Sequence, residues 1–309
     1  MQKQNRFPEN RFYTAYRKIR FIAKTGSLFS FSKPGKTGKF EISKGTFSII
    51  TFNSFLLFLL AYLIIYVFNL FITGFAALLY NIPVLVYYYD VDFLIRGIDW
   101  TPDSVSGVFS SGPIAMFVLC VFFSILYKTV ETETGILRLL LLWVIFHALT
   151  RFFGEILIGA ILNKGFGYVI LYMFVMDTGK VILTILGFVA MVTIGVLITR
   201  FALYTANIYF NDLLKDYRRK FIFCQFILPF LMGNIVILLV KIPKFSYFDF
   251  ALNMSMMLFL IPVFVRGINM KDFYFDEDPK EMKLRMTLPV TVVLLFFFFR
   301  LILGFGIRL

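Results

Sequence analysis

A series of seven apolar runs dominates the chain. Each run is about as long as the roughly 20-residue helix that crosses the hydrocarbon core of a bilayer. The runs cover residues 47–71, 108–127, 137–161, 179–199, 221–240, 249–265 and 286–305. This pattern predicts an all-α fold, a polytopic integral membrane bundle of about seven transmembrane helices.

Two further apolar stretches are ambiguous, and counting both as spans would force many hairpins without polar turns. In the first, residues 74–89, Asn81 and Pro83 break the helical pattern, and three tyrosines follow at 87–89. Proline removes a backbone donor, and tyrosine is typical of the membrane–water interface. We therefore interpret residues 74–98 as a re-entrant or interfacial element on the outer side of the membrane.

The second stretch covers residues 165–176 and is interpreted in the same way. Asp177 follows it, and an acidic residue before an apolar run favours the start of a helix. The fold prediction is therefore a seven-helix bundle with two outer re-entrant or interfacial elements. One tilted helix over residues 167–199 is the alternative, and it would bury Asp177 and Lys180 more deeply.

The distribution of basic residues sets the orientation. Of the 31 Lys and Arg residues, 23 lie in residues 1–46, 128–138, 200–220 and 266–285. These four segments share one side if the chain crosses seven times, and basic residues accumulate in cytoplasmic loops. The N-terminus is therefore predicted to be cytoplasmic. The chain divides into a basic aromatic cytoplasmic tail, residues 1–46, and a transmembrane helical domain, residues 47–309.

The tail predicts contact with membrane lipids. It carries 11 basic residues against Glu9 and Glu41, interleaved with Phe and Tyr. Anionic headgroups attract such a segment by about 1 kcal/mol per basic residue near the surface. No RNA-binding module surrounds these rings, so nucleic acid is not predicted as a partner. A membrane-protein partner or a homo-oligomer is expected instead.

Composition supports a membrane protein and narrows its chemistry. Hydrophobic residues make up 60% of the chain and charged residues 16%, whereas a soluble domain carries about 25% charged residues. His147 is the single histidine, and Cys120 and Cys224 lie inside apolar runs. Zinc motifs with two imidazoles and disulfide frameworks are therefore excluded. We predict no catalytic residue, metal or cofactor, which favours a non-enzymatic role.

Five ionisable residues lie on two consecutive apolar runs. His147, Arg151 and Glu155 follow at i, i+4 and i+8, so they share one helix face. Asp177 and Lys180 open the next helix, and the two helices are antiparallel. We expect these residues to form an intramembrane charge network, because charges at that depth are costly unless they face protein or water. The network is either a proton, ion or solute path or an ion-pair network that only fixes packing.

Short motifs suggest intramembrane proteases. Ser110–Pro113 resembles the A-G-P helix start of site-2 metalloproteases and the G-x-S-G of rhomboid proteases. The first family needs H-E-x-x-H, and this chain has His147–Arg151 as H-A-L-T-R. The second needs a histidine at the depth of its serine, and Ser111 and His147 are predicted at different depths. The resemblance implies a non-catalytic relative.

A wider set of motifs resembles a family of bacterial polytopic inner-membrane proteins to which no activity is attached. These motifs are Tyr87–Asp90, Asp99–Asp103, Ser111–Pro113, Trp143–His147 and Gly165–Tyr168. The resemblance implies a multi-pass protein of the bacterial cytoplasmic (inner) membrane. It implies no substrate.

Three functions remain open at this point. The first is a non-enzymatic subunit or scaffold of an envelope membrane complex, favoured by the lack of a catalytic set. The second is a proton- or ion-coupled transporter that uses the predicted charge network. The third is a degenerate intramembrane protease.

The predicted orientation can be tested by labelling. In a background with Cys120→Ala and Cys224→Ala, Tyr217→Cys should resist a membrane-impermeant maleimide in intact cells, because residue 217 lies in a basic, cytoplasmic connection. Asp99→Cys, in an acidic outer segment, should react. Labelling at position 217 that is as fast in intact cells as in lysed cells would reverse the orientation.

Overall fold

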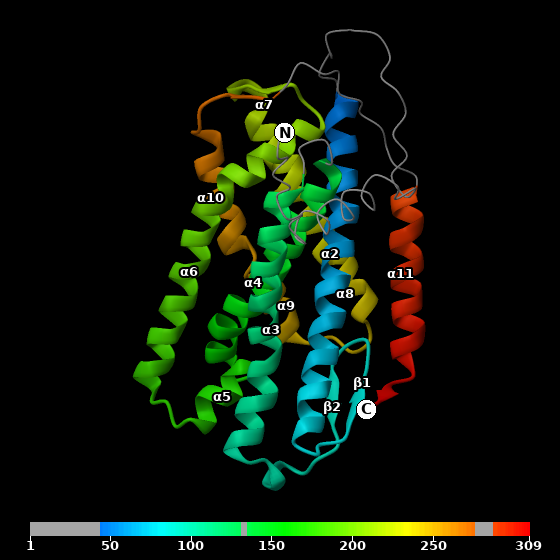
Figure 1. Ribbon diagram of the computed structural model, residues 1–309, viewed down its shortest axis with the longest axis vertical. Helices are drawn as coiled ribbons and strands as arrows, with labels where there is room; N and C mark the ends of the chain where they lie inside the picture. Colours follow the sequence, from blue (N-terminus) through cyan, green and yellow to red (C-terminus); the bar gives the residue numbers. More distant parts are fainter. Residues whose placement is uncertain (1–43, 131–134, 276–286) are drawn as a thin grey trace, which may run out of the picture. The chain divides into compact units, whose positions relative to one another are not determined.

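The computed structural model describes residues 44–130, 135–275 and 287–309, and the first 46 residues therefore lie almost entirely outside the described residues. Within these ranges seven helices are long and apolar enough to cross a membrane. They confirm the predicted all-α polytopic bundle. Successive spans alternate in direction. α2 (Lys44–Leu79) begins at the end that carries α7 (Lys215–Ile222) and finishes at the end that carries the hairpin of β1 (Val84–Val86) and β2 (Val91–Phe93) (Figure 1).

Five of the seven spans are single helices or a helix with a short 3₁₀ extension. They are α2 (Lys44–Leu79), α3 (Pro102–Thr129), α4 (Gly135–Leu162), α6 (Asp177–Tyr204) and α11 (Thr287–Gly304). The fifth span joins α7 (Lys215–Ile222), a π-helical turn (Phe223–Ile227) and α8 (Leu228–Lys241). The sixth joins α9 (Tyr247–Met254) and α10 (Met257–Ile268).

The first predicted outer element, interpreted as re-entrant or interfacial, is a β-hairpin after the end of α2. Residues 74–79 complete α2, which ends where Asn81 takes a positive φ of 58°. The chain then forms β1 (Val84–Val86) and β2 (Val91–Phe93), which pair antiparallel. Three β-branched valines, Val84, Val86 and Val91, are buried and favour extended backbone over helix.

The second predicted outer element is a short helix, α5 (Phe166–Tyr172), between α4 and α6. A break at residues 173–176, with Phe174 at a φ of 53°, separates it from α6, so the alternative of one helix over 167–199 is wrong. Gly167 lets α5 approach α4, because a Cβ at this position would overlap the carbonyl oxygen of Gly159. Asp177 does not cap α6, whose N-cap is Met176 without a side-chain bond.

The C-terminus returns to the hairpin. Gly306, at a φ of 76°, turns the chain after α11, and β5 (Ile307–Arg308) pairs antiparallel with β1, which gives the strand order β2-β1-β5 (Figure 1). Arg300 of α11 donates hydrogen bonds to Val240 and Ile242 carbonyls at the end of α8, at 2.5 and 2.8 Å. It satisfies carbonyls that a helix end leaves without intrahelical donors.

A second, two-stranded sheet lies at the α7 end. Strands β3 (Asp212–Leu213) and β4 (Phe273–Tyr274) pair antiparallel. Arg218 is fully buried beside them, where it donates to the carbonyls of Leu213 and Met270 and pairs with Asp272 at 2.5 Å. One guanidinium therefore joins the segment before α7 to the segment after α10.

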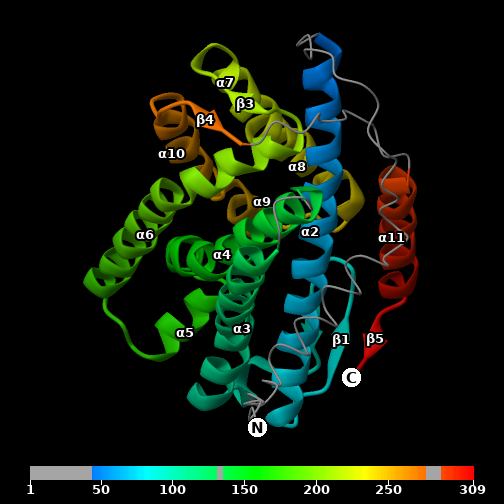
Figure 2. The ribbon, with the colours of Figure 1, turned by 45° about the horizontal axis from the view of Figure 1, so that its top comes forward.

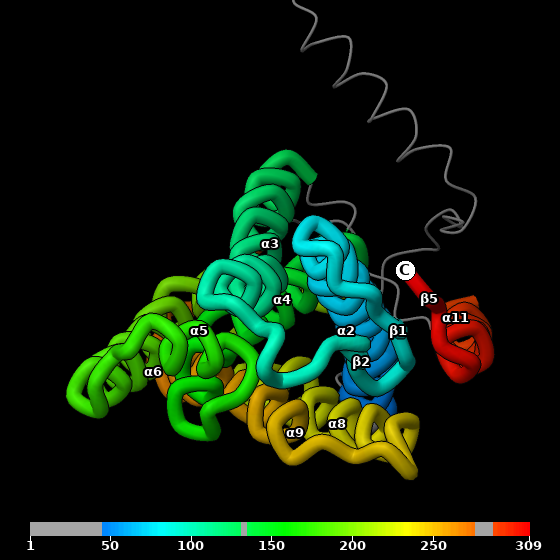
Figure 3. Tube along the Cα trace, turned by 90° about the horizontal axis from the view of Figure 1, so that it is seen from below, coloured from blue at the N-terminus to red at the C-terminus, as the bar shows by residue number. Residues whose placement is uncertain are grey.

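The core of the bundle surrounds α4, which packs against α2, α3, α5, α6 and α9 (Figure 2). Seen from the hairpin end, α11 lies at the outside of the bundle (Figure 3).

A buried hydrogen bond joins α2 to the fifth span. Pro229 has no N–H, and the Gln225 carbonyl four residues earlier instead accepts from Ser54 Oγ at 2.5 Å. Trp143 Nε1 in turn donates to Ser54 Oγ at 3.0 Å.

Candidate functional site

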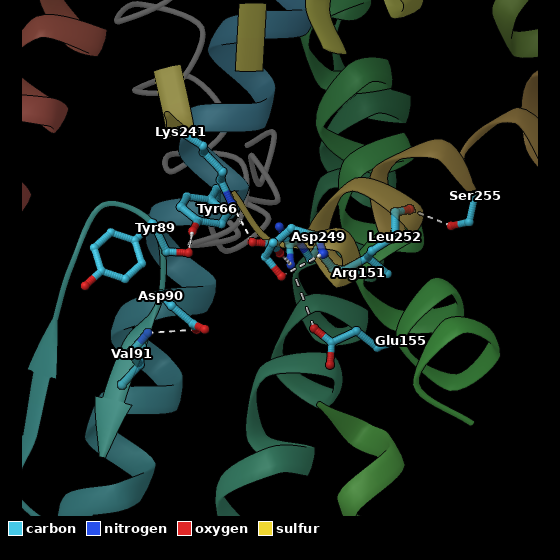
Figure 4. A network of polar contacts seen from close by, with 11 residues as sticks. Tyr66, Tyr89, Asp90, Val91, Arg151, Glu155, Lys241, Asp249, Leu252 and Ser255 are labelled. Atoms are coloured by element: carbon cyan, nitrogen blue, oxygen red, sulfur yellow. Dashed lines mark hydrogen bonds and ion pairs between the residues drawn. The ribbon is translucent and has the colours of Figure 1, made fainter. Parts of the chain in front are cut away.

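The candidate site is centred on Asp249, in the first turn of α9. Ser246 caps this helix and accepts a hydrogen bond from the backbone N–H of Asp249 at 3.4 Å. Asp249 Oδ2 lies 2.6 Å from Lys241 Nζ of α8, and Oδ1 lies 3.4 Å from Arg151 Nη1 of α4 (Figure 4). A single carboxylate therefore bridges two cations from two other helices.

Glu155 completes the charges of this network. It lies one turn after Arg151 on α4, with 4.0 Å between Arg151 Nη1 and Glu155 Oε1, and both side chains are less than 10% exposed. The formal charges of Arg151, Lys241, Asp249 and Glu155 sum to zero. Charge balance is what allows such groups to lie inside a membrane domain.

Tyr66 of α2 connects the network to the hairpin. Its ring lies under both cations, with Lys241 Nζ 4.0 Å and Arg151 Cζ 5.1 Å from the ring centroid. Such cation–π contacts are favourable where water is excluded. The Tyr66 hydroxyl donates to the carbonyl of Tyr89 in the hairpin at 2.7 Å. One side chain therefore joins the hairpin backbone to the charged residues.

The network lies well inside the bundle. Tyr66 is 13 residues before Leu79, the last residue of α2, which corresponds to about 20 Å along the helix. The turn between α8 and α9 accordingly lies beside the middle of α2 and short of its hairpin end (Figure 1).

The structure brings together two of the five residues predicted for the network, Arg151 and Glu155. His147 is buried on the same helix face, but its ring packs against Phe58 and Tyr62, with centroids 4.6 and 5.7 Å away. It therefore lies next to the network among aromatic rings and forms none of its ion pairs.

The structure does not place Asp177 and Lys180 in the network, so this part of the prediction is wrong. These two residues pair with each other at 3.6 Å, one turn apart, and the side chain of Asp177 is 99% exposed. The break after α5 places Asp177 at the surface of the hairpin end. The positions that we expected them to occupy are taken by Asp249 and Lys241.

Asp249 and Lys241 were missed because they lie at the boundaries of apolar runs. Lys241 follows run 221–240 and Asp249 begins run 249–265. Acidic residues are common in the first turn of a helix and basic residues in the last turn. The sequence therefore predicts that Asp249 and Lys241 are exposed at the membrane interface. Lys241 and Asp249 are only eight residues apart and face each other across a short turn. That spacing could have indicated that the two side chains form an ion pair.

A cavity of about 840 Å³ lies between the network and the hairpin end. Arg151, Glu155 and Asp249 form its inner wall, and exposed Asp92 and Lys164 line it nearer the surface. Ligand pockets typically occupy roughly 300–1,000 Å³ and place a few polar groups in a mainly apolar wall. The volume of this cavity lies in that range, but polar and apolar groups contribute almost equally to its wall.

Asp90 lies in the hairpin turn and also lines this cavity. Its carboxylate accepts a hydrogen bond from the Val91 N–H at 2.8 Å. Partial loss of hydration, with the negative charge of Asp249 nearby, raises the pKa of Asp90 to about 6. This carboxyl group can therefore change its charge near neutral pH.

Within the described ranges, no group of three or more His, Cys, Asp and Glu residues is arranged to hold a metal ion. Ser111, of the protease-like motif, donates a hydrogen bond from its hydroxyl to the Val108 carbonyl of its own helix at 2.7 Å.

No protein-family model matches the chain, and neither the curated proteins nor the solved structures contain a match.

The bridging role of Asp249 predicts a large loss of stability when it is removed. Asp249→Ala leaves Lys241 without its ion-pair partner, which should cost about 3–5 kcal/mol in the free energy of unfolding. SDS titration of the protein in mixed micelles measures this change. Asp177→Ala, in the exposed local pair, should leave the transition midpoint unchanged.

Charge balance provides a second arm of this experiment. Lys241→Met combined with Asp249→Leu removes one charge of each sign and should recover part of the stability lost in Asp249→Ala. A double variant whose loss of stability equals the sum of the losses in Lys241→Met alone and Asp249→Leu alone would contradict the ion-pair interpretation.

The raised pKa of Asp90 predicts a pH-dependent stability. The folded protein holds this proton more tightly than the unfolded chain, in which the pKa is near 3.8. The stabilising contribution is therefore complete below about pH 4 and is lost as the pH rises through 6. Asp90→Asn should raise the midpoint of thermal unfolding at pH 7.5. It should also make this midpoint less dependent on pH between pH 4 and 7. An unchanged pH profile would contradict this assignment.

Proposed function

We propose that this integral membrane protein is a proton- or ion-coupled carrier for a small polar solute. The seven apolar spans establish a multi-pass membrane protein. The observation that carries the proposal is the cavity whose inner wall is the buried charge network. The proposed setting is a bacterial inner membrane with the N-terminus and the α7 end in the cytoplasm and the hairpin end outside.

The placement of the cavity supports transport rather than packing alone. A network that only joined helices would have no need of an adjoining volume large enough for a ligand. Ionisable residues within membrane spans that border a polar cavity typically mark solute or ion pathways. In this protein Glu155, Arg151 and Asp249 combine these features.

Beyond the network, toward the α7 end, aromatic side chains fill the core. Phe58, Trp143, Phe226 and Phe230 are fully buried there, with ring centroids 5.0–6.2 Å apart. Access from one end and closure at the other are the properties of one state of an alternating-access carrier. In the proposed mechanism, movement between states repacks this aromatic core.

Glu155 is the proposed coupling residue. Asp249 is held by two cations, one of them at 2.6 Å, whereas Glu155 has one cation at 4.0 Å. Its carboxylate is therefore the less strongly paired anion of the network. A proton or a cation that enters from the cavity can bind at Glu155 without breaking the contact between Asp249 and Lys241.

The scaffold function, which the sequence favoured first, becomes the second hypothesis. Its interaction surface would be the exposed apolar faces of α6 and α11. Lipid covers such faces equally well, so they favour neither partner. The proposed contact of the tail with anionic headgroups falls outside the described residues. A degenerate protease gains no support, because Ser111 bonds within its own helix and His147 packs against aromatic rings.

Proton movement in liposomes tests the carrier. Vesicles that contain the protein and the pH-sensitive dye pyranine are exposed to a pool of small amines, amino acids and organic acids. The wild type should show a pool-dependent proton flux, and Glu155→Gln should reduce its rate at least tenfold because the coupling carboxylate is gone. Asp177→Asn is the matched control and should retain the wild-type rate.

Two results would overturn this proposal. One is a flux in wild-type vesicles no larger than in protein-free vesicles. The other is an unchanged flux in Glu155→Gln. The folded yield in detergent, compared between both variants, separates a transport defect from a folding defect.

A further inference from the structure

The cavity carries charges that the buried network does not use. Arg151 and Lys241 are balanced by Asp249 and Glu155, which leaves Asp90, Asp92 and Lys164 among the lining residues. None of these three forms an ion pair with another described residue. The unpaired groups around the cavity are therefore two carboxylates and one ammonium group, a net negative charge.

The surroundings of Asp90 point in the same direction. Burial is the main cause that raises the pKa of this carboxyl group; of the charges around it, Asp249 and Asp92 raise the pKa further and Lys241 lowers it. The ammonium group of Lys164 is exposed and lies on the segment between α4 and α5, whereas both aspartates belong to the hairpin. A positive group bound beside the hairpin would relieve the repulsion between these carboxylates.

Four aromatic rings from different elements form one wall of the same cavity. Phe93 of β2, Trp100, Phe109 of α3 and Tyr168 of α5 all line it. Neighbouring ring centroids are 4.9–5.5 Å apart, and all four side chains are half-buried. Aromatic faces attract cations, by about 0.5–1 kcal/mol at exposed sites and more where water is excluded.

We infer that the solute of this cavity is a small organic cation, an amine whose ammonium group lies between the hairpin carboxylates and the aromatic wall. This inference rests on the proposed function, because it assigns a substrate class to the carrier site. The carboxylates bind the charged group and the rings bind the apolar part. Arg151 and Lys241 do not repel the amine, because Asp249 and Glu155 neutralise them.

Trp100 provides a direct measurement. The chain has two tryptophans, and Trp143 is fully buried in the core away from the cavity lining. The intrinsic fluorescence of purified full-length protein in detergent is titrated with phenethylamine, a cation. 2-Phenylethanol and phenylacetate carry a similar aromatic group in neutral and anionic form. Phenethylamine should give a saturable change that is lost in Trp100→Phe, and it should bind at least tenfold more tightly than the other two.

The variants test which carboxylates bind the amine. Asp90→Asn combined with Asp92→Asn should raise the dissociation constant for phenethylamine at least tenfold. Asp99→Asn is the matched control, because Asp99 belongs to the same outer segment but pairs with Arg96 and does not line the cavity. It should change the constant less than twofold. Asp92 is exposed, so Asp92→Asn alone keeps the test valid if the double variant is unstable.

The outcomes separate this inference from the proposed function. Tighter binding of phenylacetate would overturn the cationic class and leave a solute-binding cavity in place. Equal affinity for all three compounds would likewise overturn the cationic class. So would equal affinity of the double variant and the wild type for phenethylamine. Binding of none of the three also overturns the cationic class, and the carrier proposal then depends on the proton flux alone.

Discussion

The contact on which the hairpin half of this protein depends is the bridge from Asp249 to Lys241 and Arg151. Removing three charged groups from water is costly, and attraction between them offsets that cost only at short distances with hydrogen bonds in place. α4, α8 and α9 are therefore held in one relative position. Because Tyr66 lies under both cations and bonds to Tyr89, α2 and the hairpin are fixed by the same contact.

The cavity follows from a difference in helix length. α2 and α3 have 36 and 28 residues, whereas the turn between α8 and α9 lies well before the hairpin end of α2. Short elements fill the remaining space only in part. The hairpin closes one side and α5 another, and Gly167 allows α5 to pack directly on α4. The charged residues at the turn therefore border an open volume instead of hydrocarbon.

This arrangement gives two sets of charges different roles. The inner set is balanced and buried, so it holds helices in place and presents Glu155 to the cavity. The hairpin set is negative and accessible, and it lies beside a wall of aromatic rings. A ligand that enters from the hairpin end meets the accessible set first. The linkage through Tyr66 then offers a physical route by which binding at the hairpin can affect the inner set.

Local residue patterns were enough to predict the membrane class, the seven spans and the interruption at Asn81 and Pro83. These features depend on local properties, since about 20 apolar residues form a spanning helix whatever surrounds them, and Asn81 and Pro83 interrupt one. The sequence also placed Arg151 and Glu155 on one helix face, because their spacing alone requires it.

Which charges meet depends on contacts between segments that are distant in the sequence. Asp249 and Arg151 are 98 residues apart, and no local spacing relates them, whereas Asp177 lies closer in sequence and is turned outward by the break after α5. The third strand of the small sheet and the cavity arise in the same way, from β1 pairing with β5 and from helices that end at different depths. Contacts between distant segments depend on how the helices pack, and the order of apolar and polar residues along one segment does not specify that packing.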